Sequence, residues 1–148
     1  MEKFEVLQKS RLFENILPDE LEMLSELSQM KDFKADEVIF NEGDVGNSLF
    51  VIVSGEIDVL RKGADGKLKA IAMMKEPEFF GEMSLIDKEL RSATIRSKTD
   101  TKLLILTNEN LHSFAKVFRN GFAMIVINIA RVLSLRLRET NAKLSQRM

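Results

Sequence analysis

Cysteine is absent from the 148-residue sequence, and histidine occurs once, as His112. The absence of cysteine excludes disulfides, thiol catalysis, zinc–thiolate sites and iron–sulfur clusters. A single histidine excludes a metal site that needs several histidines. We therefore predict that the protein holds no metal and no cofactor.

An excess of charge of one sign is also lacking. The chain has 22 Lys and Arg against 23 Asp and Glu, for a formal net charge of -1. It therefore has no global electrostatic footprint for DNA, RNA or an anionic membrane, and any site for an anion must be local.

Long apolar runs are missing too. The N-terminus is charged and lacks the apolar run of a signal peptide. The longest apolar stretch, residues 120–130, is flanked by Arg119 and Arg131 and is too short to span a bilayer. We expect a cytoplasmic protein with no membrane contact.

The composition, with 45% hydrophobic and 30% charged residues, is typical of a globular protein. The length fits one domain, residues 1–148. Hydrophobic periodicity divides it into N-terminal helices (1–30), a strand-rich region (31–106) and C-terminal helices (107–148).

Each region has its own signals. Pro18 in a first turn predicts a helix start at residues 17–20, and Thr107 is a predicted N-cap. Asn120-Gly121 predicts a break before a long helix over about 122–143. In the middle region, glycine turns separate short strands, a pattern of sandwiches, jelly rolls and barrels. Strands are expected at 38–40, 49–53, 56–59, 67–74, 93–97 and 102–106.

The segment 79–95, FFGEMSLIDKELRSATI, contains the chemistry. A glycine before a short helical turn aims backbone N–H groups at one point, which makes a small anion nest. Glu82 and Arg91 stand at the two ends of one loop, where a carboxylate accepts from a hydroxyl and a guanidinium pairs with anionic oxygens. From these residues alone, an ordinary Glu–Arg ion pair remains the alternative.

FGEMSL followed by RSAT resembles the phosphate-binding cassette of cyclic-nucleotide-binding domains, the family of the catabolite activator protein and the protein kinase A regulatory subunits. We call residues 79–95 the cassette. Glu42-Gly43-Asp44 and the run from Ser48 to Glu56 are similar to the same family. The resemblance implies an α+β fold: an antiparallel β-roll (double-stranded jelly roll) flanked by N-terminal helices and a long C-terminal helix.

The resemblance also implies roles for single residues. Glu82 would accept from the ribose 2′-hydroxyl, Arg91 would pair with the cyclic phosphate, and Ser92 would add a hydroxyl contact. Backbone N–H groups of Gly81, Glu82, Met83 and Ser84, with that of Ala93, would complete the phosphate cup. Serine rather than threonine after the arginine leans to cyclic AMP over cyclic GMP. Candidates for an apolar wall against the base are Val59, Ile71 and Met73, each of which also fits plain core.

The last helix suggests a way to signal. Leu133, Leu137 and Leu144 continue a helical seam that begins with Phe122, Val126 and Ile129 and includes Thr140, which predicts a homodimer through this helix. For residues 118–130, packing of the helix on the strand-rich region is an equally good interpretation. Arg136 and Arg138 lie where relatives place a cap on the base, although both also fit solvated positions. The sequence ends at Met148 without a helix-turn-helix, so we expect no direct DNA binding and an unknown downstream partner.

Three functions were weighed. The first is a receptor module that binds cyclic AMP or cyclic GMP and is not an enzyme. The second is a scaffold or dimerisation protein that keeps the fold without binding nucleotide. The third, a cupin-like metalloenzyme, needs several histidines and a nucleophile–base pair that the sequence does not offer.

Overall fold

Three helical segments precede the first strand. The computed structural model describes residues 2–147, so Met1 and Met148, the two ends of the predicted domain, lie outside the described residues. The segments are α1 (Lys3–Lys9), the short 3-10 helix η1 (Arg11–Phe13) and α2 (Pro18–Leu27). The predicted helix start is confirmed, since the Leu17 N–H donates to the Glu20 carboxylate at 2.9 Å.

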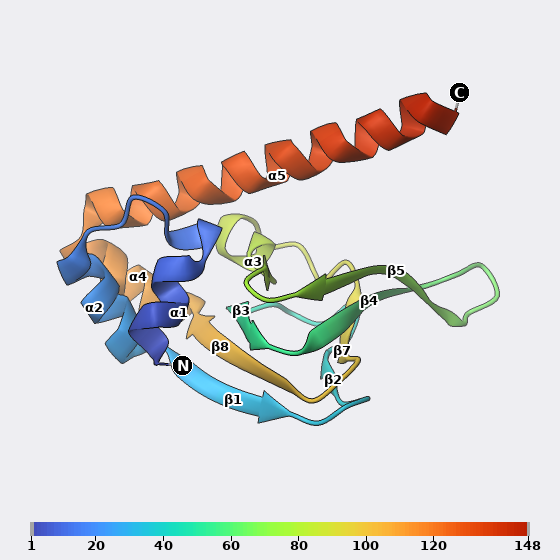
Figure 1. Ribbon diagram of the computed structural model, residues 1–148, viewed down its shortest axis with the longest axis horizontal. Coiled ribbons are helices and arrows are strands. Elements are labelled where there is room, and N and C mark those ends of the chain that lie inside the picture. The colour runs from blue at the N-terminus through green and yellow to red at the C-terminus, as the bar shows by residue number, and fades with distance from the viewer. Residues whose placement is uncertain (1, 148) are drawn as a thin grey trace.

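Eight strands follow, and all of their pairings are antiparallel. They are β1 (Gln29–Phe33), β2 (Val38–Phe40), β3 (Ser48–Ser54), β4 (Glu56–Lys62), β5 (Leu68–Lys75), β6 (Phe79–Phe80), β7 (Thr94–Ser97) and β8 (Thr101–Thr107). They form two four-stranded sheets, in the orders β1-β8-β3-β6 and β2-β7-β4-β5. The predicted antiparallel β-roll with helices at both ends of the chain is confirmed (Figure 1).

Strand β3 explains why the run Leu49 to Val53 is apolar without alternation. Leu49, Val51 and Val53 pack against the helices, whereas Phe50 and Ile52 point between the two sheets. Both faces are thus buried, and each such side chain stabilises the fold by about 1.5–3 kcal/mol.

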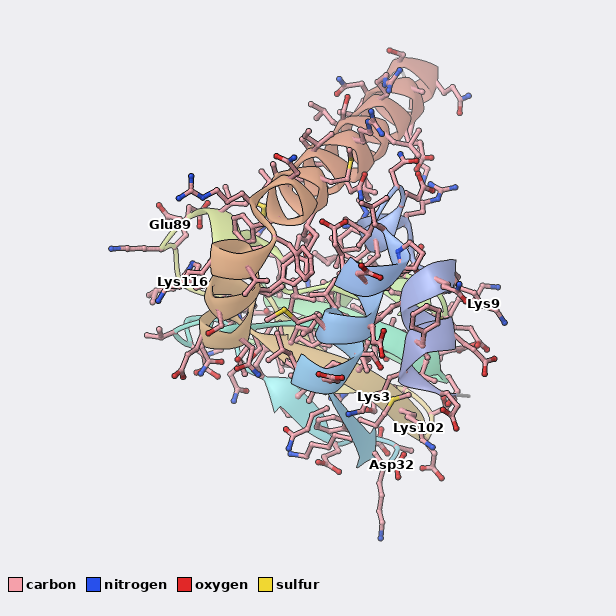
Figure 2. All side chains as sticks on the ribbon, turned by 90° about the vertical axis from the view of Figure 1, so that its left-hand side faces the viewer. Lys3, Lys9, Asp32, Glu89, Lys102 and Lys116 are labelled. Atoms are coloured by element: carbon pink, nitrogen blue, oxygen red, sulfur yellow. The ribbon has the colours of Figure 1, made fainter. Side chains whose placement is uncertain are left out.

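Strands β1 and β6 were not predicted. Strand β1 reads QMKDF, and of its five side chains only that of Phe33 is buried. Without apolar alternation this segment gives no strand signal. It pairs with β8 at the edge of its sheet. There, Oδ1 of Asp32 lies 4.0 Å from Nζ of Lys102 in β8 (Figure 2).

The C-terminal helices are α4 (Asn108–Val117) and α5 (Arg119–Arg147). Thr107 caps α4 as predicted, because its hydroxyl accepts from the Asn110 N–H at 3.1 Å. The predicted break at Asn120-Gly121 is wrong: the chain leaves the helix at Phe118, whose ring packs 5.6 Å from that of Phe114. Gly121 lies inside the first turn of α5.

Helix α5 packs on the domain through its first half, and its last turns, whose residues 137–146 are exposed, diverge from the sheets (Figure 1). Ile125, Ile129 and Val132 are buried in the core shared with α1, α2 and α4, which lie side by side at one end of the molecule (Figure 2). Asn128 is also buried, and its amide donates to the carbonyls of Leu12 and Glu14 at 2.9 and 2.8 Å.

The same helix bears on the expectation of no membrane contact. By length and composition alone, Arg119–Gln146 is long and apolar enough to cross a bilayer, with a mean hydropathy of 1.4 in its most apolar window. The sequence argument missed this because it counted an uninterrupted apolar run and stopped at Arg131, whereas Val132, Leu133 and Leu135 continue the apolar character beyond that arginine. The burial of Ile125, Ile129 and Val132 accounts for part of that apolar character within this fold.

Candidate functional site

The cassette joins β6 to β7 and forms one wall of a cavity of about 490 Å³. Its short helix α3 (Met83–Ile86) begins after Gly81 and the N-cap residue Glu82, so the predicted helical turn after the glycine is confirmed. All seven residues predicted as ligand contacts in the cassette line this cavity: Gly81, Glu82, Met83, Ser84, Arg91, Ser92 and Ala93.

Arg91 is held by two backbone carbonyls and an aromatic ring. Its guanidinium donates to the Ser48 carbonyl at 2.8 Å and to the Gly81 carbonyl at 3.0 Å. Its Cζ lies 4.1 Å from the centroid of the Phe40 ring. A guanidinium has five N–H donors, so donors remain for an anion in the cavity.

Glycine is required on both sides of this guanidinium. A Cβ at Gly46 would lie 2.8 Å from the Cζ of Arg91, and one at Gly81 would lie 3.0 Å from its Nη1. Gly81 also has a φ of +78°, in the left-handed region that favours glycine. Larger residues at either position would displace the arginine.

The backbone of Arg91 is fixed by the loop between β2 and β3. The Arg91 N–H donates to the Asp44 carbonyl, and the Gly43 N–H donates to the Arg91 carbonyl, each at 2.8 Å. The Asp44 carboxylate in turn accepts from the Asn41 N–H at 2.9 Å. This contact explains why the sequence Glu42-Gly43-Asp44, 47 to 49 positions before Arg91, belongs to the same site.

Glu82 lies across the cavity and is only 5% exposed. Its Oε1 is 3.4 Å from Nη1 of Arg136, which extends from α5 and also donates to the Phe79 carbonyl at 3.3 Å. Burial raises the pKa of the Glu82 carboxyl, against smaller opposing effects of its backbone hydrogen bond, Arg136 and Arg91. Burial likewise lowers the pKa of Arg91, and the charges of Glu82 and Asp44 oppose this.

The cavity therefore presents a cation and a carboxylate at separate points. Among residues 2–147, Arg91 and Glu82 form no ion pair with each other, because Arg91 uses carbonyls and Glu82 uses Arg136. An anion near Arg91 and a hydroxyl near Glu82 can thus be bound together.

The candidates for the apolar wall need correction. Val59 lines the cavity, but Ile71 and Met73 do not, being 59% and 47% exposed. Successive side chains of a strand point to opposite faces, and Met74 rather than Met73 shares the inner face of β5. Met74 pairs with the buried Ile57 of β4.

The two arginines proposed as a cap also differ. Arg136 lines the cavity, whereas Arg138 is exposed and does not. Two residues along a helix turn the side chain by about 200°, so only one of the two can face the cassette.

Phe40 is the functional candidate that the sequence argument missed. It lines the cavity from β2, a strand that was predicted without a role in the site. Nothing in the segment Val38-Ile39-Phe40 indicates which of the three side chains points at Arg91, which follows Phe40 by 51 positions. Met74 was also missed, because the sequence does not show how β4 and β5 pair, and this pairing decides which side chains of β5 face the cavity.

Comparison with known proteins identifies the family to which this chain is similar. The model of the cyclic nucleotide-binding domain matches residues 30–117. The chain is 31% identical over 138 residues to the cyclic AMP receptor protein of Thermus thermophilus, and the match covers 93% of this chain and 62% of that protein. The chain thus spans about three-fifths of the length of this curated relative.

Solved structures agree. A cyclic nucleotide-binding domain from Methylobacillus flagellatus has a TM-score of 0.85 at 25% identity, covering 99% of this chain and 82% of that one. The regulatory domain of Toxoplasma gondii protein kinase A, crystallised with cyclic AMP, has a TM-score of 0.70 at 25% identity, covering 76% and 42%.

Proposed function

Because this chain belongs to the cyclic nucleotide-binding domain family, we propose that it is a receptor module for cyclic AMP or cyclic GMP. The observation that carries the proposal is that Arg91 and Glu82 line one cavity of about 490 Å³. This volume lies within the usual range for small-molecule sites, about 300–1,000 Å³. Residues 1–148 would act as one module, in the cytoplasm, as a sensor rather than an enzyme.

In the proposed complex, Arg91 pairs with the cyclic phosphate through the donors that its carbonyl contacts leave free. Glu82 accepts from the ribose 2′-hydroxyl, and the backbone N–H groups from Gly81 to Ser84, with that of Ala93, surround the phosphate. Charge-assisted hydrogen bonds of this kind are about twice as strong as neutral ones. Ser92 adds a hydroxyl.

The base lies in this proposal against Val59 and Met74. Their side chains offer no strong hydrogen-bonding group, so they contribute apolar contact rather than base readout. Ser92 in place of threonine supports cyclic AMP over cyclic GMP. We therefore rank cyclic AMP first.

Signalling would run through α5. Arg136 of this helix contacts both the Glu82 carboxylate and the Phe79 carbonyl. A ligand that binds Glu82 changes the environment of Arg136. If the ligand binds more tightly to one position of α5 than to another, it shifts the population of the protein toward that position. The partner that reads α5 is a downstream protein or domain.

A second copy of the chain is our proposal for the exposed side of α5. The predicted seam through Phe122, Val126 and Ile129 does not suit this role, because Ile129 is buried in the core and Phe122 packs against it. An exposed stripe, which shares Leu137 and Leu144 with the predicted seam, repeats along the helix at spacings of four and three. Its members are Ala123, Ile127, Ala130, Ser134, Leu137, Asn141 and Leu144.

This stripe has the pattern of a coiled coil. Ile127, Ser134 and Asn141 would occupy the a positions, and Ala123, Ala130, Leu137 and Leu144 the d positions. The core-facing residues Ile125 and Val132 then both fall on f, the side opposite the seam. A single asparagine at an a position fixes the register of a two-stranded coil. The proposed homodimer therefore leaves the cavity of each copy free.

Titration calorimetry with cyclic AMP and cyclic GMP tests the proposed function. We expect heat and saturable binding for at least one of the two, with cyclic AMP tighter. The matched control is 5′-AMP, which has the same base and ribose but an open phosphate. If neither cyclic nucleotide binds at millimolar concentration, the alternative of a scaffold that keeps the fold without nucleotide would replace this proposal.

A further inference from the structure

Strand β2 pairs with β7 through an irregular register. Val38 lies opposite Arg96, but Phe40 lies opposite Ile95 rather than Thr94. One extra residue on β2 therefore stands against β7, which is a β-bulge. Bulges next to binding sites turn a side chain toward the site, and Phe40 lies directly beyond this one.

The ring of Phe40 has two kinds of neighbour. Arg91 lies over it with Cζ 4.1 Å from the ring centroid, closer than the 5.9 Å from Cζ to the centroid of Phe50. Phe50 and Phe80, which stack on each other at 4.9 Å, lie 5.8 and 6.0 Å from the Phe40 ring. Phe50 and Phe80 thus pack against the Phe40 ring, and the Phe40 ring packs against the Arg91 guanidinium.

The contact with the Phe40 ring stabilises the charged form of Arg91. The guanidinium is partly buried, and burial disfavours its charged form. A ring face is electrostatically negative, so it offsets the loss of water without occupying any of the N–H donors, which lie in the plane of the guanidinium. Glu82, whose recorded ion-pair partner is Arg136, does not provide this support at contact distance.

We propose that Phe40 is the positioning residue of the anion site: its ring orients the Arg91 guanidinium for the ligand phosphate. The proposal rests on the proposed function in its use of a cyclic nucleotide as the anion. It predicts that Phe40 sets the affinity for the phosphate, through Arg91, rather than the affinity for the base.

Phe40→Leu and Phe40→Tyr form a matched pair, because leucine keeps an apolar side chain without a ring and tyrosine keeps the ring. We expect Phe40→Leu to weaken cyclic AMP binding about tenfold, the range of a desolvated cation–π contact. Phe40→Tyr should stay within about twofold of the unsubstituted chain. Adenosine, which lacks the phosphate, should bind all three proteins equally weakly.

A double-substitution cycle with Arg91→Ala isolates the coupling. Once Arg91 is absent, Phe40→Leu should cost no further affinity. Full additivity, an equal loss for adenosine and cyclic AMP, or a Phe40→Tyr protein as weak as Phe40→Leu would each overturn the proposal.

A measurement without nucleotide keeps this result separate from the proposed function. The ring current of Phe40 should shift the NMR signal of the Arg91 Nε–H, and Phe40→Leu should remove that shift. If the shift is present but no cyclic nucleotide binds, the proposed function fails and the positioning of Arg91 stands. If the shift is absent, the positioning role itself is wrong.

Discussion

In the proposed complex, Arg91 is the charged partner of the ligand phosphate. Arg91→Ala leaves a bound phosphate without its charged partner, which should weaken cyclic AMP binding by about 2–4 kcal/mol. The fold should change little, because the arginine contacts backbone carbonyls at the edge of the cavity. Calorimetry measures the loss, and Arg138→Ala is the control, since Arg138 is exposed outside the cavity. Unchanged affinity would mean that the ligand binds elsewhere.

Glu82 should make both stability and binding depend on pH. Burial raises its pKa above the ordinary value of 4.5, so the folded chain takes up the proton more readily than the unfolded chain. The contribution of Glu82 to the free energy of unfolding is therefore largest at low pH and falls as pH rises from 4.5 through the higher folded pKa.

Glu82→Gln removes this titration while keeping the shape of the side chain. Thermal unfolding followed from neutral pH down to 4.5, the ordinary value for this carboxyl, should show the unsubstituted chain gaining stability relative to Glu82→Gln as pH falls. Cyclic AMP affinity of the unsubstituted chain should decline over the same window, because protonation removes the charged acceptor. A stability difference that is constant with pH would contradict the raised pKa.

At the scale of elements, Asn128 ties α5 to η1. Its amide is buried and donates to two carbonyls. Asn128→Ala leaves both carbonyls without these donors, so we expect a loss of about 2–3 kcal/mol in the free energy of unfolding. Urea denaturation measures it, with Lys143→Ala, an exposed position on the same helix and off the proposed seam, as the control. An equal effect of both changes would show that Asn128 is not a tether.

Element boundaries also show where sequence reasoning fails. The start of α2 and the Thr107 cap are local signals, and both were predicted. Gly121 does not break α5: it lies where a Cβ would meet the Glu20 carboxylate of α2, a tertiary contact that no local rule encodes. Strand β1 forms because β8 offers it a partner, not because of its own composition.

For the whole molecule, Leu137 tests the proposed dimer. It is 61% exposed and lies on the seam of α5. Leu137→Glu would place two like charges together across the two-fold axis and should give a monomer at micromolar concentration. Lys143→Glu, on the same helix but off the seam, should leave the dimer intact. Sedimentation velocity distinguishes them, and a monomeric unsubstituted chain would rule the dimer out.

By itself the sequence determined the cassette, because its nest, its carboxylate and its arginine lie within 17 consecutive residues and need only one local loop. It also determined the helix–roll–helix order, since hydrophobic period is a local property. The tertiary structure decided which side chains of other elements contact the cassette or line its cavity. A bulge in β2 brought Phe40 under Arg91, strand register chose Met74 over Met73, and helix rotation chose Arg136 over Arg138. Each of these choices turns on which way a side chain points, and that direction is fixed only by partners distant in the chain.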